Sequence, residues 1–409
     1  MWLYMGSNAS CHHNPTHLVD SLDEPNFLHN TKQKISERKQ MLSGERVDGC
    51  QYCWNAEDAE IISDRLMKSY QYDWRNYNSN IPLAVNPKKI EIAFSRSCQL
   101  ACAYCGPSFS SSWANDVNTN GSYGLVSNAR FNKDIKSKLI PDDSNPYIQA
   151  FFDWWPEVKK ELSVIRITGG EPLLHIKFWE FLNLLDTDRD YRGDFLVNSN
   201  LIHEKGQVEK LIEKTKFLVD NDCKVEVHTS CESGMAAAEY TRDGFKSEVW
   251  LRNVHLLLGT SNIDITITTA INNMSVWSFN EYLLMINSLR EQYGINRVQL
   301  NFNRVLYPQW HQIALIPFNF REEIAKTLED TFNDCEYLQD ELSIMGFREF
   351  VSYLRTAVFT DQYNSEKQVL TDMIKFYDQY NIRRNKDILT LDVRYITWVE
   401  SVRERLRHG

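Results

Sequence analysis

The chain has 409 residues, of which 43% are hydrophobic, so it can form one large domain with appendages or two domains. Its net charge of −10 argues against nucleic acid as the main partner. It contains no apolar run of membrane-spanning length and no N-terminal signal peptide, so no membrane partner is expected. Nine cysteines without an export signal predict a reducing, cytoplasmic compartment rather than a disulfide framework.

Residues 1–85 are predicted to form a separate cysteine-bearing segment. Cys50 and Cys53 form a C-x2-C pair, and Cys11 lies far upstream. One interpretation is an iron–sulfur cluster held by these three cysteines and one further ligand. The candidates for that ligand are a water, the substrate, His12, His13 and Cys231. The alternatives are a structural zinc site that uses Cys11, a histidine and the pair, or a redox dithiol at the pair.

Strand-like and helix-like segments alternate from Lys89 to about Val305. The predicted strands are Ile90–Ser95, Val164–Thr168, Phe195–Asn198, Val225–Ser230, Ile263–Ile271 and Val298–Val305. The predicted helices between them are Phe178–Leu185, Val208–Val219, Val249–Leu258 and Phe279–Tyr293. Such alternation predicts parallel strands with crossover helices. Residues 86–317 are therefore expected to form an α/β fold, a partial (β/α)6 TIM-like barrel with its chemistry at the carboxyl ends of the strands.

The first predicted strand leads into Cys98-x3-Cys102-x2-Cys105. Three thiolates at this spacing fit three corners of an iron–sulfur cube and leave the fourth iron open to a chelating substrate. A zinc site or three buried thiols is the alternative, although zinc sites usually combine two cysteine pairs. The stretch from Gly106 to about Asp143 is rich in Ser, Asn and Gly, and it is expected to be an irregular loop near the cluster.

The second predicted strand leads into Gly169-Gly170-Glu171-Pro172. Two glycines let the backbone approach a ligand closely, and the glutamate offers an acceptor for an ammonium group. By itself, this turn is as consistent with a strand-to-helix loop as with a site. Its position one strand after the cysteine motif favours a site.

The cysteine spacing, Tyr104 before the last cysteine and the Gly169–Pro172 turn together resemble the radical S-adenosylmethionine superfamily. Residues 38–57 resemble the auxiliary-cluster region of its SPASM/twitch members, which include phage proteins with a twitch domain. The resemblance implies a 4Fe–4S cluster on Cys98, Cys102 and Cys105, with S-adenosyl-L-methionine beside the glycine turn. It also implies a second iron–sulfur cluster at the N-terminal cysteines, where this chain departs from the pattern because only three cysteines are available locally.

Other strand-end residues gain roles from this resemblance. Tyr104 is expected to pack by the adenine, or to shield the cluster from water. The triplet Asn198-Ser199-Asn200, with Asn198 as the first candidate, is expected to hold the cofactor ribose or carboxylate, with a helix N-cap as the alternative. Ser230 is expected to contact the cofactor, while the adjacent Cys231 and Glu232 face the substrate or Cys231 is a buried thiol. Arg242 is expected to bind the cofactor carboxylate, or to form a surface ion pair.

The implied activity is reductive cleavage of S-adenosylmethionine to a 5′-deoxyadenosyl radical that abstracts hydrogen from a substrate. Its electrons are expected from a reductant such as flavodoxin or ferredoxin. SPASM/twitch relatives often act on peptides, so oxidative modification of a peptide or protein is the first expectation, and a small metabolite or nucleoside the second. A non-catalytic iron–sulfur or electron-transfer protein and a zinc-binding module are the alternatives, although a simple carrier needs no amine-binding turn.

Residues 318–409 are predicted to be helical and lie outside the resemblance. The predicted helices are Arg321–Cys335, Tyr337–Ala357, Glu366–Tyr380 and Tyr395–Arg407. The expected roles of these helices are completion of the barrel, binding of a partner or dimerisation, and the sequence does not distinguish among them.

Overall fold

The computed structural model describes residues 1–71, 82–127, 144–204, 206–361 and 363–408. The chain divides into two compact units, Met1–Ser95 with Lys138–Arg166, and Arg96–Ser137 with Ile167–Gly409. The three predicted segments, 1–85, 86–317 and 318–409, have other bounds than these two units, and they stay a prediction. The predicted irregular loop from Gly106 to about Asp143 contains the helix α4, Ser111–Asn120, so the prediction is wrong there, and residues 128–143 lie outside the described residues. Within the described ranges, no helix combines the length and apolarity needed to cross a membrane.

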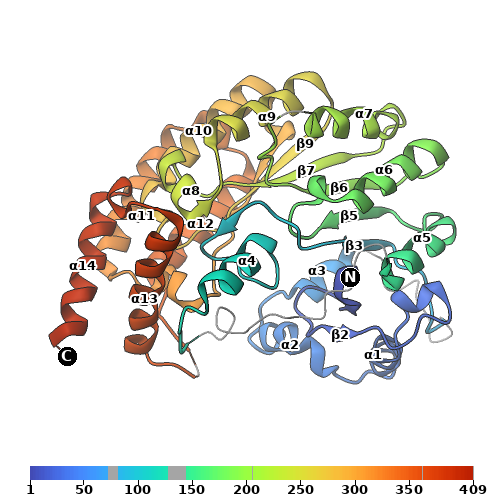
Figure 1. Cartoon of the computed structure of the whole chain (residues 1–409), viewed down its shortest axis with the longest axis horizontal. Coiled ribbons are helices and arrows are strands. Elements are labelled where there is room, and N and C mark those ends of the chain that lie inside the picture. Colours follow the sequence, from blue (N-terminus) through green and yellow to red (C-terminus); the bar gives the residue numbers. More distant parts are fainter. Residues whose placement is uncertain (72–81, 128–143, 205, 362, 409) are drawn as a thin grey trace. The chain divides into compact units, whose positions relative to one another are not determined.

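Six strands form one parallel sheet, which confirms the predicted α/β class (Figure 1). The strands are β3 Lys89–Ala93, β5 Val164–Thr168, β6 Asp194–Asn198, β7 Val225–Ser230, β9 Asp264–Thr268 and β10 Val298–Leu300. Their order in the sheet is β10-β9-β7-β6-β5-β3, so neighbours in the chain are neighbours in the sheet. In this order β3 and β10 are the two edges, and closure into a partial barrel stays a prediction.

The last two strands are shorter than predicted. β9 ends at Thr268 instead of Ile271, and β10 ends at Leu300. The Thr269 N–H donates to the Asn301 side-chain oxygen (3.0 Å), and the Thr269 hydroxyl donates to the Asn301 carbonyl (2.8 Å). Such side-chain hydrogen bonds to the backbone compete with a regular ladder, and hydrophobic pattern alone does not reveal them.

Helices connect the strands as predicted. They are α6 Ile176–Asp188, α7 Gln207–Asp220, α9 Ser247–Thr260 and α10 Phe279–Tyr293. In Figure 1 these four helices lie along one side of β6, β7 and β9. On α7, Val208, Leu211 and Leu218 are buried at helical spacing, and such an apolar stripe is what lets a crossover helix cover a sheet.

The C-terminal region is helical, as predicted. Its helices are α11 Phe318–Asp334, α12 Glu341–Thr356, α13 Glu366–Arg384 and α14 Val393–His408. α13 packs against α4 (Ser111–Asn120), where the Tyr380 and Trp113 rings stack with their centroids 6.2 Å apart. The Tyr380 hydroxyl also donates to the Ala101 carbonyl at 3.4 Å. The C-terminal region therefore supports the loop that carries the Cys98 motif.

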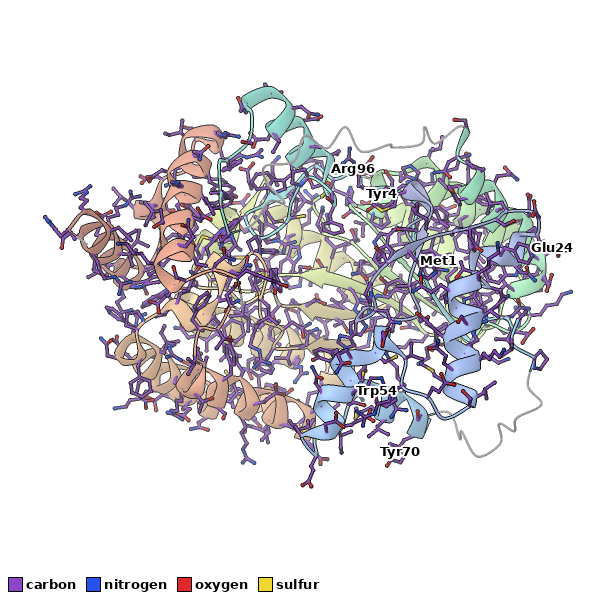
Figure 2. All side chains as sticks on the ribbon, turned by 90° about the horizontal axis from the view of Figure 1, so that it is seen from below. Met1, Tyr4, Glu24, Trp54, Tyr70 and Arg96 are labelled. Carbon is purple, nitrogen blue, oxygen red and sulfur yellow. The ribbon has the colours of Figure 1, made fainter. Side chains whose placement is uncertain are left out.

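The first unit contains short elements around the N-terminal cysteines. Its helices are α1 Lys32–Leu42, α2 Gln51–Asp58, α3 Asp64–Gln71 and α5 Pro146–Val158. Trp54 on α2 is labelled in Figure 2. The guanidinium carbons of Arg46 and Arg65 lie over its ring, 5.1 and 4.1 Å from the centroid. Arg65 also pairs with Glu57 of α2. These contacts tie α3 to α2, which follows directly after Cys50.

Candidate cofactor and metal sites

The backbone of the Cys98 motif is held by a short antiparallel ladder. β4 (Ala101–Cys102) pairs with β8 (Arg242–Asp243), and Cys102 faces Arg242 in this register. The Ala103 N–H donates to the Thr241 carbonyl at 2.7 Å. The Trp113 indole N–H donates to the Cys102 carbonyl at 2.8 Å. Segments far apart in the sequence therefore set the positions of the cysteines.

Of the three cysteines of the motif, Cys102 is buried, and Cys98 and Cys105 are half-buried. Burial raises the pKa of Cys98 well above its ordinary value, and the charges of Cys102 and Cys105 raise it further. Burial also raises the pKa of Cys102, to about 12, although Arg242 opposes this shift. The Cys98 sulfur accepts the Leu100 N–H at 3.4 Å and the Asn200 amide at 3.9 Å. Donors of this kind favour a thiolate, which is the form that ligates a metal.

The spacing of these thiols bears on the zinc alternative. Around one zinc ion, sulfur ligands at about 2.3 Å stand roughly 3.8 Å from one another. Among the described residues, the only group of three ligand atoms that all lie within 4.8 Å of one another consists of His12, His13 and Asp64. Both cysteine trios are therefore more open than a single zinc ion requires. Wider separation suits a cube, in which each thiolate binds a different iron.

The glycine turn after β5 touches the cysteine loop directly. The Glu171 N–H donates to the Ser97 carbonyl at 2.7 Å. A Cβ atom on Gly170 would lie 2.4 Å from the same Ser97 oxygen and 2.5 Å from the Arg96 oxygen, so no side chain fits there. Gly169 has φ +129°, a conformation that favours glycine. Two motifs separated by about 70 residues thus meet at one place.

Glu171 is buried and its carboxylate is already engaged. It accepts the Asn200 N–H at 2.6 Å, the Ser199 hydroxyl at 2.9 Å and the Leu173 N–H at 3.1 Å. His203 Nε2 also lies 3.3 Å from Oε1. The predicted role of Glu171 as an ammonium acceptor stays a prediction. Its visible role is to fasten the glycine turn to the end of β6.

Sequence reasoning missed part of this contact. Asn198, the first candidate of its triplet, is the last residue of β6, and the next two residues are the ones that reach Glu171 and Cys98. The Asn198-Ser199-Asn200 triplet was the available signal. His203 had no signal in the sequence, because only the return of the chain after β6 brings it to Glu171.

If the chain binds S-adenosylmethionine as its sequence predicts, Glu171→Ala should weaken that binding by at least about tenfold, and it should in any case lower the thermal midpoint of unfolding. The reason is that it leaves several buried donors unsatisfied, each costing about 1–3 kcal/mol. Equilibrium binding and thermal melting measure the two effects. Glu180→Ala, on the exposed face of α6, is the matched control and should change neither quantity. A weakened affinity with an unchanged midpoint would instead favour direct contact between Glu171 and the cofactor.

A buried charged network stands beside Cys102. Arg242 Nη1 lies 3.3 Å from Glu232 Oε2 and donates to the Tyr104 hydroxyl. The Tyr104 hydroxyl donates to Glu232 Oε1 at 2.9 Å. Glu232 is fully buried and Arg242 is 5% exposed, so the alternative of a surface ion pair is wrong. Arg242 Nε is buried and finds no hydrogen-bond partner among the described residues.

The strand β7 ends at Ser230, and the next two residues, Cys231 and Glu232, are buried. Ser230 is the last residue of β7 and pairs with Thr268 of β9. Cys231 is completely buried, its thiol donates to the Ser233 carbonyl at 3.7 Å, and burial raises its pKa to about 12. These observations favour the buried-thiol interpretation of Cys231. Glu232 is turned into the charged network.

The first unit brings its own cysteines together. Cys50 and Cys53 are buried at the start of α2, and Cys11 is half-buried. Burial raises the pKa of Cys50, and the charges of Cys11 and Cys53 raise it further. The Cys11 thiol donates to the Asn14 side-chain oxygen at 3.4 Å. A Cβ atom on Gly49, the residue before the pair, would lie 2.9 Å from the Asn14 side-chain nitrogen, so the loop that carries Cys11 lies against the start of the pair.

The fold and these two groups of thiols define an α/β protein with a parallel sheet and two candidate thiolate metal sites. A scan against protein-family models and a search of curated proteins gave no match to the chain.

Proposed function

We propose that the chain is a radical S-adenosylmethionine enzyme whose 4Fe–4S cluster is held by Cys98, Cys102 and Cys105. The observation that supports this most directly is the contact between the two motifs, the 2.7 Å hydrogen bond from the Glu171 N–H to the Ser97 carbonyl. A cofactor that chelates the cluster must have its amino-acid end next to the thiols. A turn that binds this end must therefore touch the cysteine loop, whereas an electron carrier needs no such turn.

The residues around the thiols fit a bound cluster. Buried thiols with raised pKa values keep their protons unless a cation compensates the charge, and iron supplies that charge. The hydrogen-bond donors near Cys98 remain available to its thiolate. When bound, the cluster and S-adenosylmethionine together supply the 5′-deoxyadenosyl radical that abstracts hydrogen. In the same proposal, the six strands close as a partial (β/α)6 barrel.

The chain itself orients the cofactor and excludes water. Arg242 directs its unpartnered Nε at the cofactor carboxylate, while Glu232 and Tyr104 hold the guanidinium in place. Trp113 is fully buried under the Cys102 carbonyl, where it and α13 keep water from the rear of the loop. The glycine turn receives the methionine end, and Glu171 fixes the turn.

Residues Cys11, Cys50 and Cys53 are proposed to hold a second iron–sulfur cluster that accepts an electron or binds substrate. The charges of Cys11 and Cys53 raise the pKa of Cys50, which supports a shared site for the three thiols. The proposed reaction is an oxidative modification of a peptide or protein, with electrons from flavodoxin or ferredoxin. The choice of substrate rests on the resemblance to SPASM/twitch enzymes.

Anaerobic reconstitution tests the proposal. We expect about eight irons per chain, and 5′-deoxyadenosine when dithionite and S-adenosylmethionine are added. The variant that lacks Cys98, Cys102 and Cys105 should keep about four irons and form no 5′-deoxyadenosine. If this variant binds no iron, the N-terminal cluster does not exist. If iron-loaded wild-type protein neither binds nor cleaves S-adenosylmethionine, the proposed function is wrong.

A further inference from the structure

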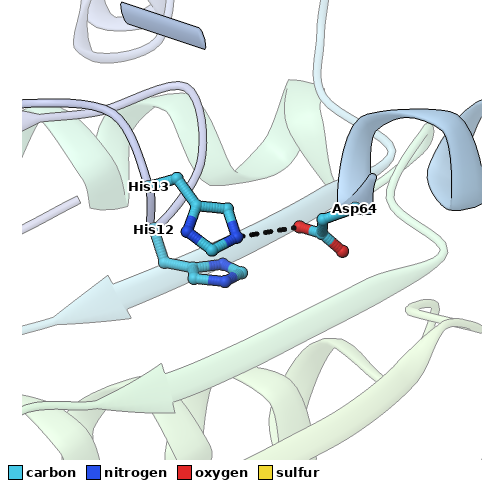
Figure 3. Close-up of side chains that lie close together, drawn as sticks. All are labelled: His12, His13 and Asp64. Carbon is cyan, nitrogen blue, oxygen red and sulfur yellow. Dashed lines mark ion pairs between the residues drawn. The ribbon is translucent and has the colours of Figure 1, made fainter. Parts of the chain in front are cut away.

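Two consecutive histidines and a distant aspartate meet in the first unit (Figure 3). His12 and His13 occupy a turn after Cys11, and Asp64 is the first residue of α3. In an extended chain, consecutive side chains point to opposite sides. The turn instead brings the two rings together, with centroids 4.0 Å apart, and Figure 3 shows His13 directed at Asp64.

The three side chains have the spacing of ligands around one metal ion. One nitrogen of each histidine and one Asp64 oxygen all lie within 4.8 Å of one another. His13 Nε2 and Asp64 Oδ2 are 3.6 Å apart, which is long for a hydrogen bond. Nitrogen and oxygen ligands at about 2.0–2.2 Å from a tetrahedral ion stand roughly 3.4 Å from one another. The 3.6 Å between His13 Nε2 and Asp64 Oδ2 is therefore close to the distance between two ligands of one tetrahedral ion.

Neighbouring side chains hold the group in place and compensate its charge. The His13 ring stacks on Tyr52 with centroids 3.9 Å apart and planes 13° apart. The Lys68 ammonium lies 2.6 Å from Asp64 Oδ2, the same oxygen that faces His13. A cation is thus already attracted to this position, and a metal ion would compete with Lys68 for Asp64. His12 is exposed, so the group is open to solvent.

We propose that His12, His13 and Asp64 form a mononuclear site for a divalent transition metal of the zinc class, distinct from the thiol site of Cys11, Cys50 and Cys53. Two imidazoles and one carboxylate suit zinc or ferrous ion and leave coordination positions open. The bound ion joins the turn after Cys11 to α3, and so steadies the loop that carries Cys11. The proposal does not depend on radical chemistry.

The test uses the full chain with its iron sites reconstituted anaerobically, freed of loose metal by a chelator and titrated with Co²⁺ or Zn²⁺. We expect one ion per chain by equilibrium dialysis, with a Co²⁺ spectrum that lacks thiolate charge transfer. His12→Ala, His13→Ala and Asp64→Asn should each weaken binding by at least about tenfold. His255→Ala, which removes an exposed histidine of the other unit, is the control and should leave binding unchanged.

Lys68→Met distinguishes metal ligation by Asp64 from an effect of misfolding. Because it frees the Asp64 carboxylate, it should tighten metal binding several-fold, which a misfolded protein would not do. Unchanged binding in the His12, His13 and Asp64 variants would overturn the proposal. So would a thiolate charge-transfer band that disappears in Cys11→Ala, because the ion would then belong to the thiol site. Failure of S-adenosylmethionine cleavage would leave this result unaffected.

Discussion

Cys102→Ala is expected to reduce 5′-deoxyadenosine formation to background and to remove about four irons per reconstituted chain. Cys102 is the buried central thiol of its motif, and its carbonyl is fixed by the Trp113 indole. Two remaining thiolates would leave half of the cube's irons without a protein ligand. Iron analysis and chromatography of the nucleoside product measure the two effects.

Cys223→Ala is the matched control for this loss. Cys223 is also a buried thiol with a pKa raised by burial, but its thiol donates to the Asn221 carbonyl between α7 and β7, away from the Cys98 motif in the chain. Its replacement should leave both the iron content and the product unchanged. Full cleavage activity in Cys102→Ala would mean that the catalytic cluster has been assigned to the wrong cysteines.

Arg242→Met is expected to destabilise the second unit strongly. It leaves the Glu232 carboxylate fully buried without its cationic partner. Breaking a buried ion pair in this way costs about 3–5 kcal/mol, so the thermal midpoint should fall by roughly 5 °C or more. Thermal melting followed by circular dichroism measures this shift in the iron-free protein.

A double-mutant cycle separates the ion pair from general packing. Arg242→Met combined with Glu232→Met should be less destabilising than Arg242→Met alone, because the double variant buries no unpaired charge. Arg252→Met, whose guanidinium is half-exposed near Glu204, should shift the midpoint little. Additive effects of the two substitutions would show that Arg242 and Glu232 do not act as a pair.

A charge-conserving substitution tests whether Arg242 binds the cofactor. If Arg242 binds the S-adenosylmethionine carboxylate, Arg242→Lys should weaken cofactor binding more than it lowers the melting midpoint, because lysine keeps the charge but loses the planar fork. An equal effect on binding and stability would restrict Arg242 to support of the cysteine loop.

Much of the fold was readable because it depends on local patterns. The strands Val164–Thr168 and Val225–Ser230 and the helix Phe279–Tyr293 have the predicted bounds, since each is a strongly patterned run. The ends of β9 and β10 were overestimated where polar side chains such as those of Thr269 and Asn301 redirect the backbone. Periodicity carries no information about such contacts.

The sequence by itself determined the parallel α/β class and identified the two groups of cysteines and the glycine turn, because these depend on periodicity and spacing. Only the tertiary structure decided that Glu171 is engaged by Ser199 and Asn200, and that Arg242 is buried against Glu232. It also decided that Asp64 faces His13 and that α13 supports the cysteine loop. The physical reason is that these contacts join residues from 10 to 279 positions apart in the chain, and the packing of the chain sets their geometry.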